Sequence, residues 1–289
     1  MKIGLLDIDG HNFPNLALMK ISAYHKSIGD PVEWVNYFNS YDIVYQSKVF
    51  TFSPDNQNIL HAVQIIKGGT GYDPLIKLDP KIENCSPDYL IYPNLKHAYG
   101  FLTRGCPNHC SWCIVPKKEG GIRANSDIED ILQGRKSAIL MDNNILACDY
   151  GIQQIEKIIK LKVKVDFNQG LDARLIDRPI AKLLSQVRCL MPLRLSCDTM
   201  AMLRHVKKAV RYLREYNCTP QRYFVYVLIQ DPSEALKRIN LLKKWNLDPF
   251  AMPYMDYKPK VKVPMETHKL VRWTNRKAIF KSVKFENYR

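Results

Sequence analysis

The chain has 289 residues, of which 46% are hydrophobic and 25% are charged, and Lys and Arg outnumber Asp and Glu by 43 to 28. A chain of this size buries a full core without disulfide support, and its net charge of +15 favours an anionic partner such as nucleic acid. The sequence has no apolar run long enough for a membrane span or a signal peptide, and eight cysteines are too few for a disulfide scaffold. We therefore expect a reduced, cytoplasmic protein with no membrane partner.

The first 95 residues predict a small Rossmann-like or flavodoxin-like domain. An apolar run ends at the turn-prone Asp9-Gly10, and Leu16, Met19 and Ala23 then recur at helical spacing. Strands that alternate with helices are typical of a parallel sheet. The expected strands of this domain are Lys2–Ile8, Val32–Val35, Asp42–Tyr45, Val63–Ile66 and Tyr89–Tyr92.

From His97 the alternation resumes with longer units. A complete eight-unit βα barrel takes about 250 residues, whereas residues 97–257 number 161 and leave room for five or six units. We predict an α/β protein in which residues 96–257 form a partial (βα)6 TIM-like barrel after the Rossmann-like domain of residues 1–95. The expected strands are Ala98–Thr103, Ala138–Met141, Val163–Phe167, Leu193–Ser196, Tyr223–Ile229 and Phe250–Tyr254.

The helices of this region begin at recognisable caps. Ser126 and Glu129 form a capping box, and Asp231 precedes Pro232 at a second helix start. The helix near 202–216 has one apolar face, and its other face is typical of the solvated outside of a barrel helix. The basic residues of that face are Arg204, Lys207, Lys208, Arg211 and Arg214.

The most informative stretch is 101–121, FLTRGCPNHCSWCIVPKKEGG. Cys106, Cys110 and Cys113 follow an expected strand with the spacing C-x-x-x-C-x-x-C. Three thiolates within eight residues can converge on one soft metal centre. A four-iron cluster takes four ligands, so three cysteines leave one iron open to a substrate or cofactor. Zinc is the rival and would need a fourth protein ligand such as His109 or His97.

The motif resembles the signature of the radical SAM superfamily, C-x-x-x-C-x-aromatic-C, in which Trp112 supplies the aromatic residue. The wider loop, including Pro107 and Pro116, is similar to that of the methylthiotransferases and of the cobalamin-type radical SAM enzymes. The resemblance implies that the three cysteines hold a [4Fe-4S] cluster whose open iron chelates S-adenosylmethionine. A reduced cluster would then generate a 5′-deoxyadenosyl radical, with electrons from a donor such as flavodoxin or ferredoxin.

The resemblance also directs attention to the carboxyl ends of the strands, where barrel sites lie. After the second strand, Asp142-Asn143-Asn144 replaces the Gly-Gly-Glu-like segment that binds the methionyl ammonium in the family. Further polar groups follow the third, fourth and fifth strands at the same rim. The expected cofactor-binding residues are Trp112, Asp142, Asn143, Asn144, Gln169, Arg194, Ser196 and Ile229.

The N-terminal domain carries weaker signals. Methylthiotransferases have three cysteines there for an extra cluster, whereas this chain has only Cys85, which argues against methylthiolation. Asp9-Gly10-His11 matches the start of a cobalamin motif, but the pattern ends in Pro14, and we favour a degenerate domain over one that binds cobalamin. Gly68-Gly69-Thr70-Gly71 lacks the ending of a P-loop and predicts a tight turn.

Residues 258–289 form a basic C-terminal extension that holds ten Lys or Arg and two Glu. Its cations, among them Lys277, Lys281 and Lys284, alternate with aromatic residues such as Trp273 and Phe280. This pattern is typical of single-stranded nucleic-acid binding, although an amphipathic segment packed on the barrel would show it too.

Three functional hypotheses follow. The first is a radical SAM enzyme that modifies RNA, in particular tRNA, and the second is a radical SAM enzyme that acts on a peptide or small metabolite. The third, from another class, is a non-catalytic nucleic-acid-binding protein stabilised by zinc.

Overall fold

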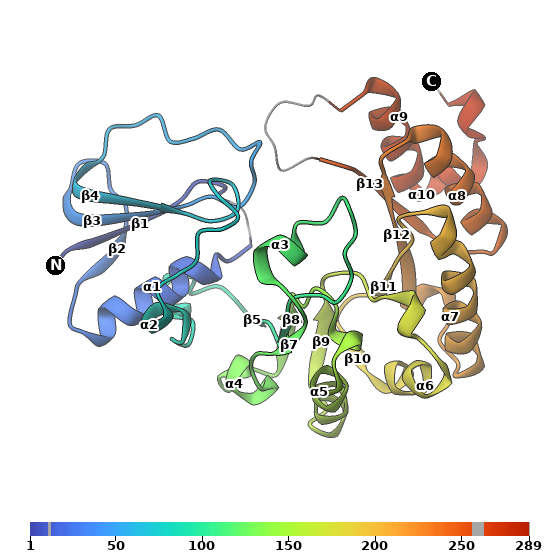
Figure 1. Ribbon diagram of the computed structural model, residues 1–289, viewed down its shortest axis with the longest axis horizontal. Helices are drawn as coiled ribbons and strands as arrows, with labels where there is room; N and C mark the ends of the chain where they lie inside the picture. The colour runs from blue at the N-terminus through green and yellow to red at the C-terminus, as the bar shows by residue number, and fades with distance from the viewer. Residues whose placement is uncertain (11–12, 256–262, 289) are drawn as a thin grey trace.

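The computed structural model describes residues 1–10, 13–255 and 263–288. The chain is an α/β protein built on parallel sheets, as the sequence predicts (Figure 1). No helix in these three ranges is both long and apolar enough to cross a membrane.

The N-terminal sheet has the strand order β2-β1-β3-β4, and all neighbouring strands are parallel. The helix α1 (Leu16–Ser27) is capped by Asn15, whose side chain accepts a hydrogen bond from the Leu18 backbone. Leu18 packs against Ile3 and Leu5 of the central strand, so this core lies between α1 and the sheet. The strands are β1 (Ile3–Asp7), β2 (Val32–Trp34), β3 (Ser40–Ser47) and β4 (His61–Gly68).

Two expectations for this region are wrong. Residues 48–60 connect parallel strands without a helix, so strands and helices do not alternate throughout. The expected strand Tyr89–Tyr92 is a 3-10 helix, η1 (Tyr89–Ile91), because the Asp88 carboxylate caps the Leu90 amide. The Tyr89 hydroxyl accepts from the Tyr99 amide at 2.8 Å, which holds η1 against the next part of the chain. The remaining helix is the short α2 (Pro80–Glu83).

The rest of the chain forms two further parallel sheets, β5-β8-β9-β10 and β11-β12-β13. They are linked where Leu171 forms an isolated parallel bridge with Leu195 and its amide donates to the Arg194 carbonyl. The strands are β5 (Ala98–Gly100), β8 (Ser137–Leu140), β9 (Lys164–Phe167), β10 (Arg188–Cys189), β11 (Leu193–Ser196), β12 (Tyr223–Ile229) and β13 (Pro249–Pro253).

Helices follow the strands and cover their outer side (Figure 1). Alternate strand residues such as Val165, Leu195 and Val227 are buried in one large core with these helices, so the residues between them point to the inner side. The helices are α4 (Ile128–Leu132), α5 (Asp149–Lys160), α6 (Arg178–Gln186), α7 (Leu203–Glu215) and α8 (Pro232–Lys244). The 3-10 helices are η2 (Ile145–Ala147), η3 (Ala173–Leu175), η4 (Met200–Met202), η5 (Pro220–Arg222) and η6 (Phe285–Asn287).

The expected strand 98–103 is two strands. After β5 the chain turns into β6 (Thr103–Arg104), which pairs antiparallel with β7 (Arg123–Ala124). The cap of α4 is Asp127 and not the predicted Ser126, because the Asp127 carboxylate accepts from the Glu129 amide at 2.9 Å. The predicted cap at Asp231 is confirmed for α8.

The C-terminal extension forms α9 (Met265–Asn275) and α10 (Lys277–Ser282). Trp273 and Phe280 are buried in the large core, with ring centres 5.0 Å apart. The Asn275 side chain bonds both the amide and the carbonyl of Ala251 on β13, at 2.8 and 2.9 Å. The aromatic residues of the extension therefore serve packing.

Candidate functional site

The three motif cysteines lie on a loop between β6 and β7, residues 105–122, which we call the cysteine loop. The Cys106 amide donates to the Gly120 carbonyl at 3.2 Å and closes this loop at its base. Gly105 has a φ of 83°, and a Cβ there would lie 2.2 Å from the Gly121 carbonyl oxygen. A glycine is therefore required directly before the first cysteine. The loop contains the short helix α3 (Val115–Glu119).

All three thiols are free, with Cys106 and Cys110 half-buried and Cys113 exposed. Burial raises the pKa of Cys110, and the neighbouring Cys113 thiol raises it further. Within the described part of the chain, no group of three His, Cys, Asp or Glu side chains is placed to hold a single metal ion. In an iron–sulfur cluster the cysteines bind separate iron atoms, so the donor chemistry of three neighbouring thiols still fits such a cluster.

Glu119 joins the ends of the cysteine loop to the strand beside it. Its side chain is 8% exposed and pairs with Arg104 of β6 at 3.1 Å. The same carboxylate accepts from the Gly105 amide at 3.0 Å and from the Asn143 side chain at 2.8 Å. Glu119 thus fixes the residue before Cys106 next to the segment that follows β8.

Among the predicted residues, Asn144 contacts one of the cysteines, Cys106. Its side-chain nitrogen lies 3.6 Å from the Cys106 sulfur and 3.3 Å from the Asp172 carboxylate. Asp172 also accepts from Asn108 of the cysteine loop at 3.1 Å and pairs with Arg174 at 2.7 Å. The buried Oδ1 of Asn144 has no hydrogen-bond partner among the described atoms.

Asp142 is buried, and its Oδ1 accepts from both the amide and the hydroxyl of Thr103. Burial raises its pKa to about 6, against the opposing effect of the Thr103 hydrogen bonds. Its Oδ2 is buried and, among the described atoms, unpartnered. Asp142 therefore holds an unused acceptor at the end of β8, where the sequence predicts a cofactor ligand.

Arg194 and Ser196 lie on the inner side of β11, opposite the buried Leu193 and Leu195. The Arg194 guanidinium forms a buried ion pair with Asp166 and donates to the Phe167 carbonyl at 2.8 Å. Arg194, one of the expected cofactor-binding residues, is thus already paired within the protein. Because the Arg194 guanidinium neutralises the buried Asp166 carboxylate, breaking this pair would leave an uncompensated buried charge.

The other predicted residues are more dispersed. Trp112 is half-buried in the cysteine loop, and Gln169 is exposed after β9. Ile229 is 2% exposed and packs in the outer core with the helices. Its side chain therefore points away from the inner side, because it has the parity of Val225 and Val227.

The sequence prediction missed Asp198, which follows β11. Burial raises its pKa, and its Oδ1 accepts from the Leu228 amide at 3.4 Å. Burial is the main cause of the raised pKa of Cys110 and Cys113, and the negative charge of Asp198 adds to it. The signal was available, because Asp198 follows its strand as Asp142 follows β8.

Two other predicted features fall outside this site. Asp9 accepts from the Val49 amide and the Ser53 hydroxyl and so anchors a loop, while His11 of the cobalamin pattern lies outside the described residues. In the C-terminal extension, Lys277 pairs with Asp248 at 2.7 Å.

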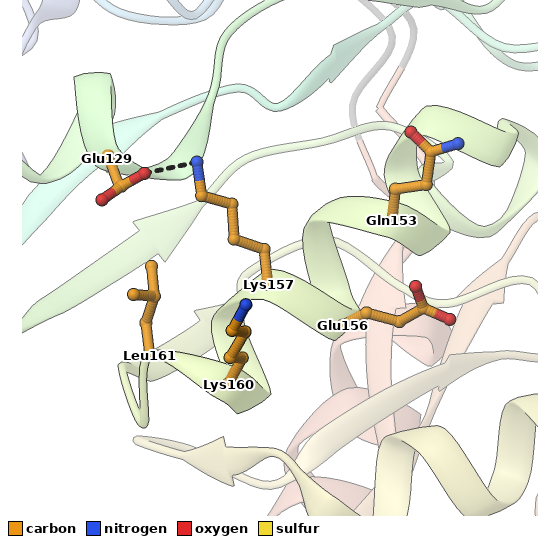
Figure 2. Close-up of a pocket in the computed structure, with 6 residues that line it drawn as sticks. All are labelled: Glu129, Gln153, Glu156, Lys157, Lys160 and Leu161. Atoms are coloured by element: carbon orange, nitrogen blue, oxygen red, sulfur yellow. Dashed lines mark ion pairs between the residues drawn. The ribbon is translucent and has the colours of Figure 1, made fainter.

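A surface hollow between α4 and α5 is separate from the cysteine loop. Figure 2 shows Lys157 reaching across it to Glu129, with which it forms an ion pair. No residue of the cysteine loop lines this hollow. Its lining residues are Glu129, Gln153, Glu156, Lys157, Lys160 and Leu161.

No protein-family model matches the chain. Part of it is similar to curated proteins named ribosomal protein uS12 methylthiotransferase RimO. The Clostridium kluyveri protein is 30% identical over 132 residues, and the match covers 39% of this chain and 29% of that protein. The Thermus thermophilus protein is 30% identical over 104 residues, covering 33% and 21%. The Elusimicrobium minutum protein is 30% identical over 131 residues, covering 39% and 30%. The chain thus spans less than a third of the length of these relatives, and the similarity to methylthiotransferases is distant and partial.

Proposed function

We propose that this chain is a radical SAM enzyme in which Cys106, Cys110 and Cys113 hold a [4Fe-4S] cluster. The observation that carries the proposal is the cysteine loop itself. It holds three neighbouring thiols, is closed at its base by the hydrogen bond from Cys106 to Gly120, and places Cys106 against Asn144. The partial similarity to methylthiotransferases supports the same class of enzyme. When bound, the reduced cluster would cleave S-adenosylmethionine and supply a radical that abstracts hydrogen from the substrate.

We further propose that the two C-terminal parallel sheets act as one incomplete barrel over residues 96–257, with residues 1–95 as a separate N-terminal domain. The Leu171–Leu195 bridge supports a continuous strand series, and separate core clusters support the division. The extension 258–289 would then complete the barrel unit, because Leu270 and Trp273 belong to the larger core.

The residues of the chain have distinct tasks in this proposal. Glu119 holds the cysteine loop closed against Asn143, and Asn144 orients the Cys106 sulfur. The unpartnered oxygens of Asp142 and Asn144 offer acceptors for the ammonium of S-adenosylmethionine. Asp198, which follows β11, adds a negative charge that, together with burial, raises the pKa of Cys110. The ion pair between Arg194 and Asp166 links β11 to β9.

The substrate is RNA in our first hypothesis, which rests on the net charge of +15. The names of the relatives favour a second candidate, a protein substrate, because those proteins are methylthiotransferases of a ribosomal protein. Both candidates need the same cofactors.

Anaerobic reconstitution with iron and sulfide tests the proposal. The parent protein should turn brown and, once reduced by dithionite or flavodoxin, should convert S-adenosylmethionine to 5′-deoxyadenosine. Cys110→Ala should abolish this cleavage, whereas Cys148→Ala, which changes a cysteine outside the motif, should retain it. A colourless protein with one tightly held zinc, or retained cleavage in Cys110→Ala, would show that the proposal is wrong. Stimulation by bulk RNA or by ribosomal protein would separate the two substrate candidates.

A further inference from the structure

A row of positive charges runs from the candidate site across the outer side of η3, α6 and α7. We call it the cationic strip. One of its members, Arg174, lies on η3, and another, Arg178, begins α6. The other three lie on α7. The cationic strip consists of Arg174, Arg178, Arg204, Lys208 and Arg211.

Tyr212 holds the middle of the strip in place. The charged groups of Arg178, Lys208 and Arg211 lie 4.8, 5.7 and 5.0 Å from the centre of its ring. Glu215 pairs with Arg178 at 2.9 Å and lies 3.9 Å from Arg211. Side chains that are already ordered lose less entropy when a ligand binds.

The strip has more positive charge than the protein neutralises. Its carboxylate partners are Asp172, which pairs with Arg174, and Glu215. Among the ion pairs of the described residues, neither Arg204 nor Lys208 takes part. Five cations thus face two carboxylates, so the surface favours an anionic partner.

One end of the strip meets the candidate site. Arg174 pairs with Asp172, and the same carboxylate accepts from Asn108 of the cysteine loop. The helix η3, which carries Arg174, packs against α7, which carries Arg204, Lys208 and Arg211. A ligand that follows the strip therefore arrives at the cysteines.

The basic face of α7 is in fact divided into two parts. Lys207 lies over the Trp245 ring at 5.2 Å, and Arg214 donates to the Tyr223 hydroxyl and the Trp245 carbonyl. These cations are used by the protein itself. Arg204, Lys208 and Arg211 form the other part, which faces solvent and α6.

The spacing of the strip fits a chain of phosphates better than a single anion. At a rise of about 1.5 Å per residue, Lys208 lies about 6 Å along α7 from Arg204, and Arg211 about 10 Å. The alternative RNA surface, the C-terminal extension, has Trp273 and Phe280 buried, so these rings are not free to stack on bases.

We propose that the cationic strip binds single-stranded RNA and directs it to the cysteine loop. RNA binding stands without the proposed radical chemistry, whereas the delivery of a nucleotide to the cysteines rests on it. Phosphates lie along Arg204, Lys208 and Arg211, and Arg174 holds the end nearest the cysteines.

The test compares two triple variants that lose the same charge. The strip variant is Arg204→Gln, Lys208→Gln and Arg211→Gln, and the control is Lys277→Gln, Lys281→Gln and Lys284→Gln in the C-terminal extension. The probe is a fluorescent oligouridylate of about 20 nucleotides, measured by anisotropy between about 50 and 200 mM salt. The strip variant should bind about 10-fold or more weakly, and the slope of log affinity against log salt should fall by about 2. The control should keep both quantities close to the parent.

Circular dichroism and thermal unfolding first establish that both variants are folded. If the strip variant is not folded, the single variant Lys208→Glu provides a second measurement of the same binding. An equal loss in strip and control variants, a loss in the control alone, or unchanged binding would overturn the proposal. So would normal RNA binding combined with slower reduction by flavodoxin, which would assign the strip to an acidic protein partner. The anisotropy assay needs no iron–sulfur cluster. Its result therefore stands even if the protein fails to cleave S-adenosylmethionine.

Discussion

Asp142 shows how burial changes a single ionisable group at the candidate site. Its pKa is about 6, against an ordinary value of 3.8, so the folded protein retains a proton that the unfolded chain releases. The contribution of this carboxyl to stability is fully present below about pH 4 and is lost as the pH rises through about 6.

Asp142→Asn removes this titration while keeping an oxygen that can accept from Thr103. Between about pH 4 and pH 7 the parent should lose about 3 kcal/mol of unfolding free energy relative to the variant. Urea unfolding of the protein without iron, at a series of pH values, measures the difference. Parallel pH curves for the two proteins would contradict the prediction.

Gly105 limits the cysteine loop through its backbone. Gly105→Ala places a Cβ 2.2 Å from the Gly121 carbonyl oxygen, so the base of the loop has to open. We expect iron content after reconstitution to fall sharply. Gly120→Ala is the matched control, because Gly120 also has a positive φ of 75° but a Cβ there meets no atom within 4 Å. Equal iron content in both variants would show that loop closure is not needed.

At the scale of elements, α8 fastens the ends of two strands. Arg238 is 1% exposed and donates to the carbonyls of Cys197 and Leu228, while Glu234 pairs with it and accepts from the Met200 amide. The Cys197 carbonyl directly precedes Asp198, and the other carbonyl belongs to Leu228, whose amide donates to the Asp198 carboxylate.

Arg238→Met should lower the unfolding free energy by about 3 kcal/mol, because it leaves buried carbonyls without donors and Glu234 without its partner. Chemical denaturation measures this loss. Lys237→Met, at an exposed position of the same helix, should change stability by less than about 0.5 kcal/mol. Similar effects of the two substitutions would contradict the role of Arg238.

Strands were more predictable than turns. The alternation of Leu193 and Leu195 with Arg194 and Ser196 identified β11 and its two faces, because a period of two is a local property. The 3-10 helix at Tyr89 could not be predicted in this way. The cap of Asp88 on the Leu90 amide is local, but the hydrogen bond from the Tyr99 amide to the Tyr89 hydroxyl depends on a contact ten residues away.

At the scale of the whole molecule, the C-terminal helices belong to the large core. Trp273 is 1% exposed, lies against Phe280 and Phe285, and donates to the Val283 carbonyl at 3.0 Å. Trp273→Ala should cost about 3 to 5 kcal/mol of stability, measured by thermal and urea unfolding. Met265→Ala, which changes a side chain that is 78% exposed on the same helix, is the control. A small effect at Trp273 would mean that the helices fold apart from the core.

The candidate site was predictable where its residues are close in sequence. Cys106, Cys110 and Cys113 share one loop, so their spacing alone indicates a common centre. Asp198 could have been found from its position directly after a strand. The contacts of Glu119 with Arg104 and Asn143 depend on how the folded chain places the cysteine loop, and no local pattern marks them. The basic pattern of the extension indicated RNA, whereas its aromatic residues fill the core.

Asn275 has a consequence for how the protein behaves in concentrated solution. β13 is the last strand of its sheet, and an unpaired strand edge is a template on which another chain can add. The side-chain amide of Asn275 occupies the amide and the carbonyl of Ala251 at this edge. A single asparagine thus blocks the middle of the edge without adding a strand, and α9 protects the sheet from aggregation.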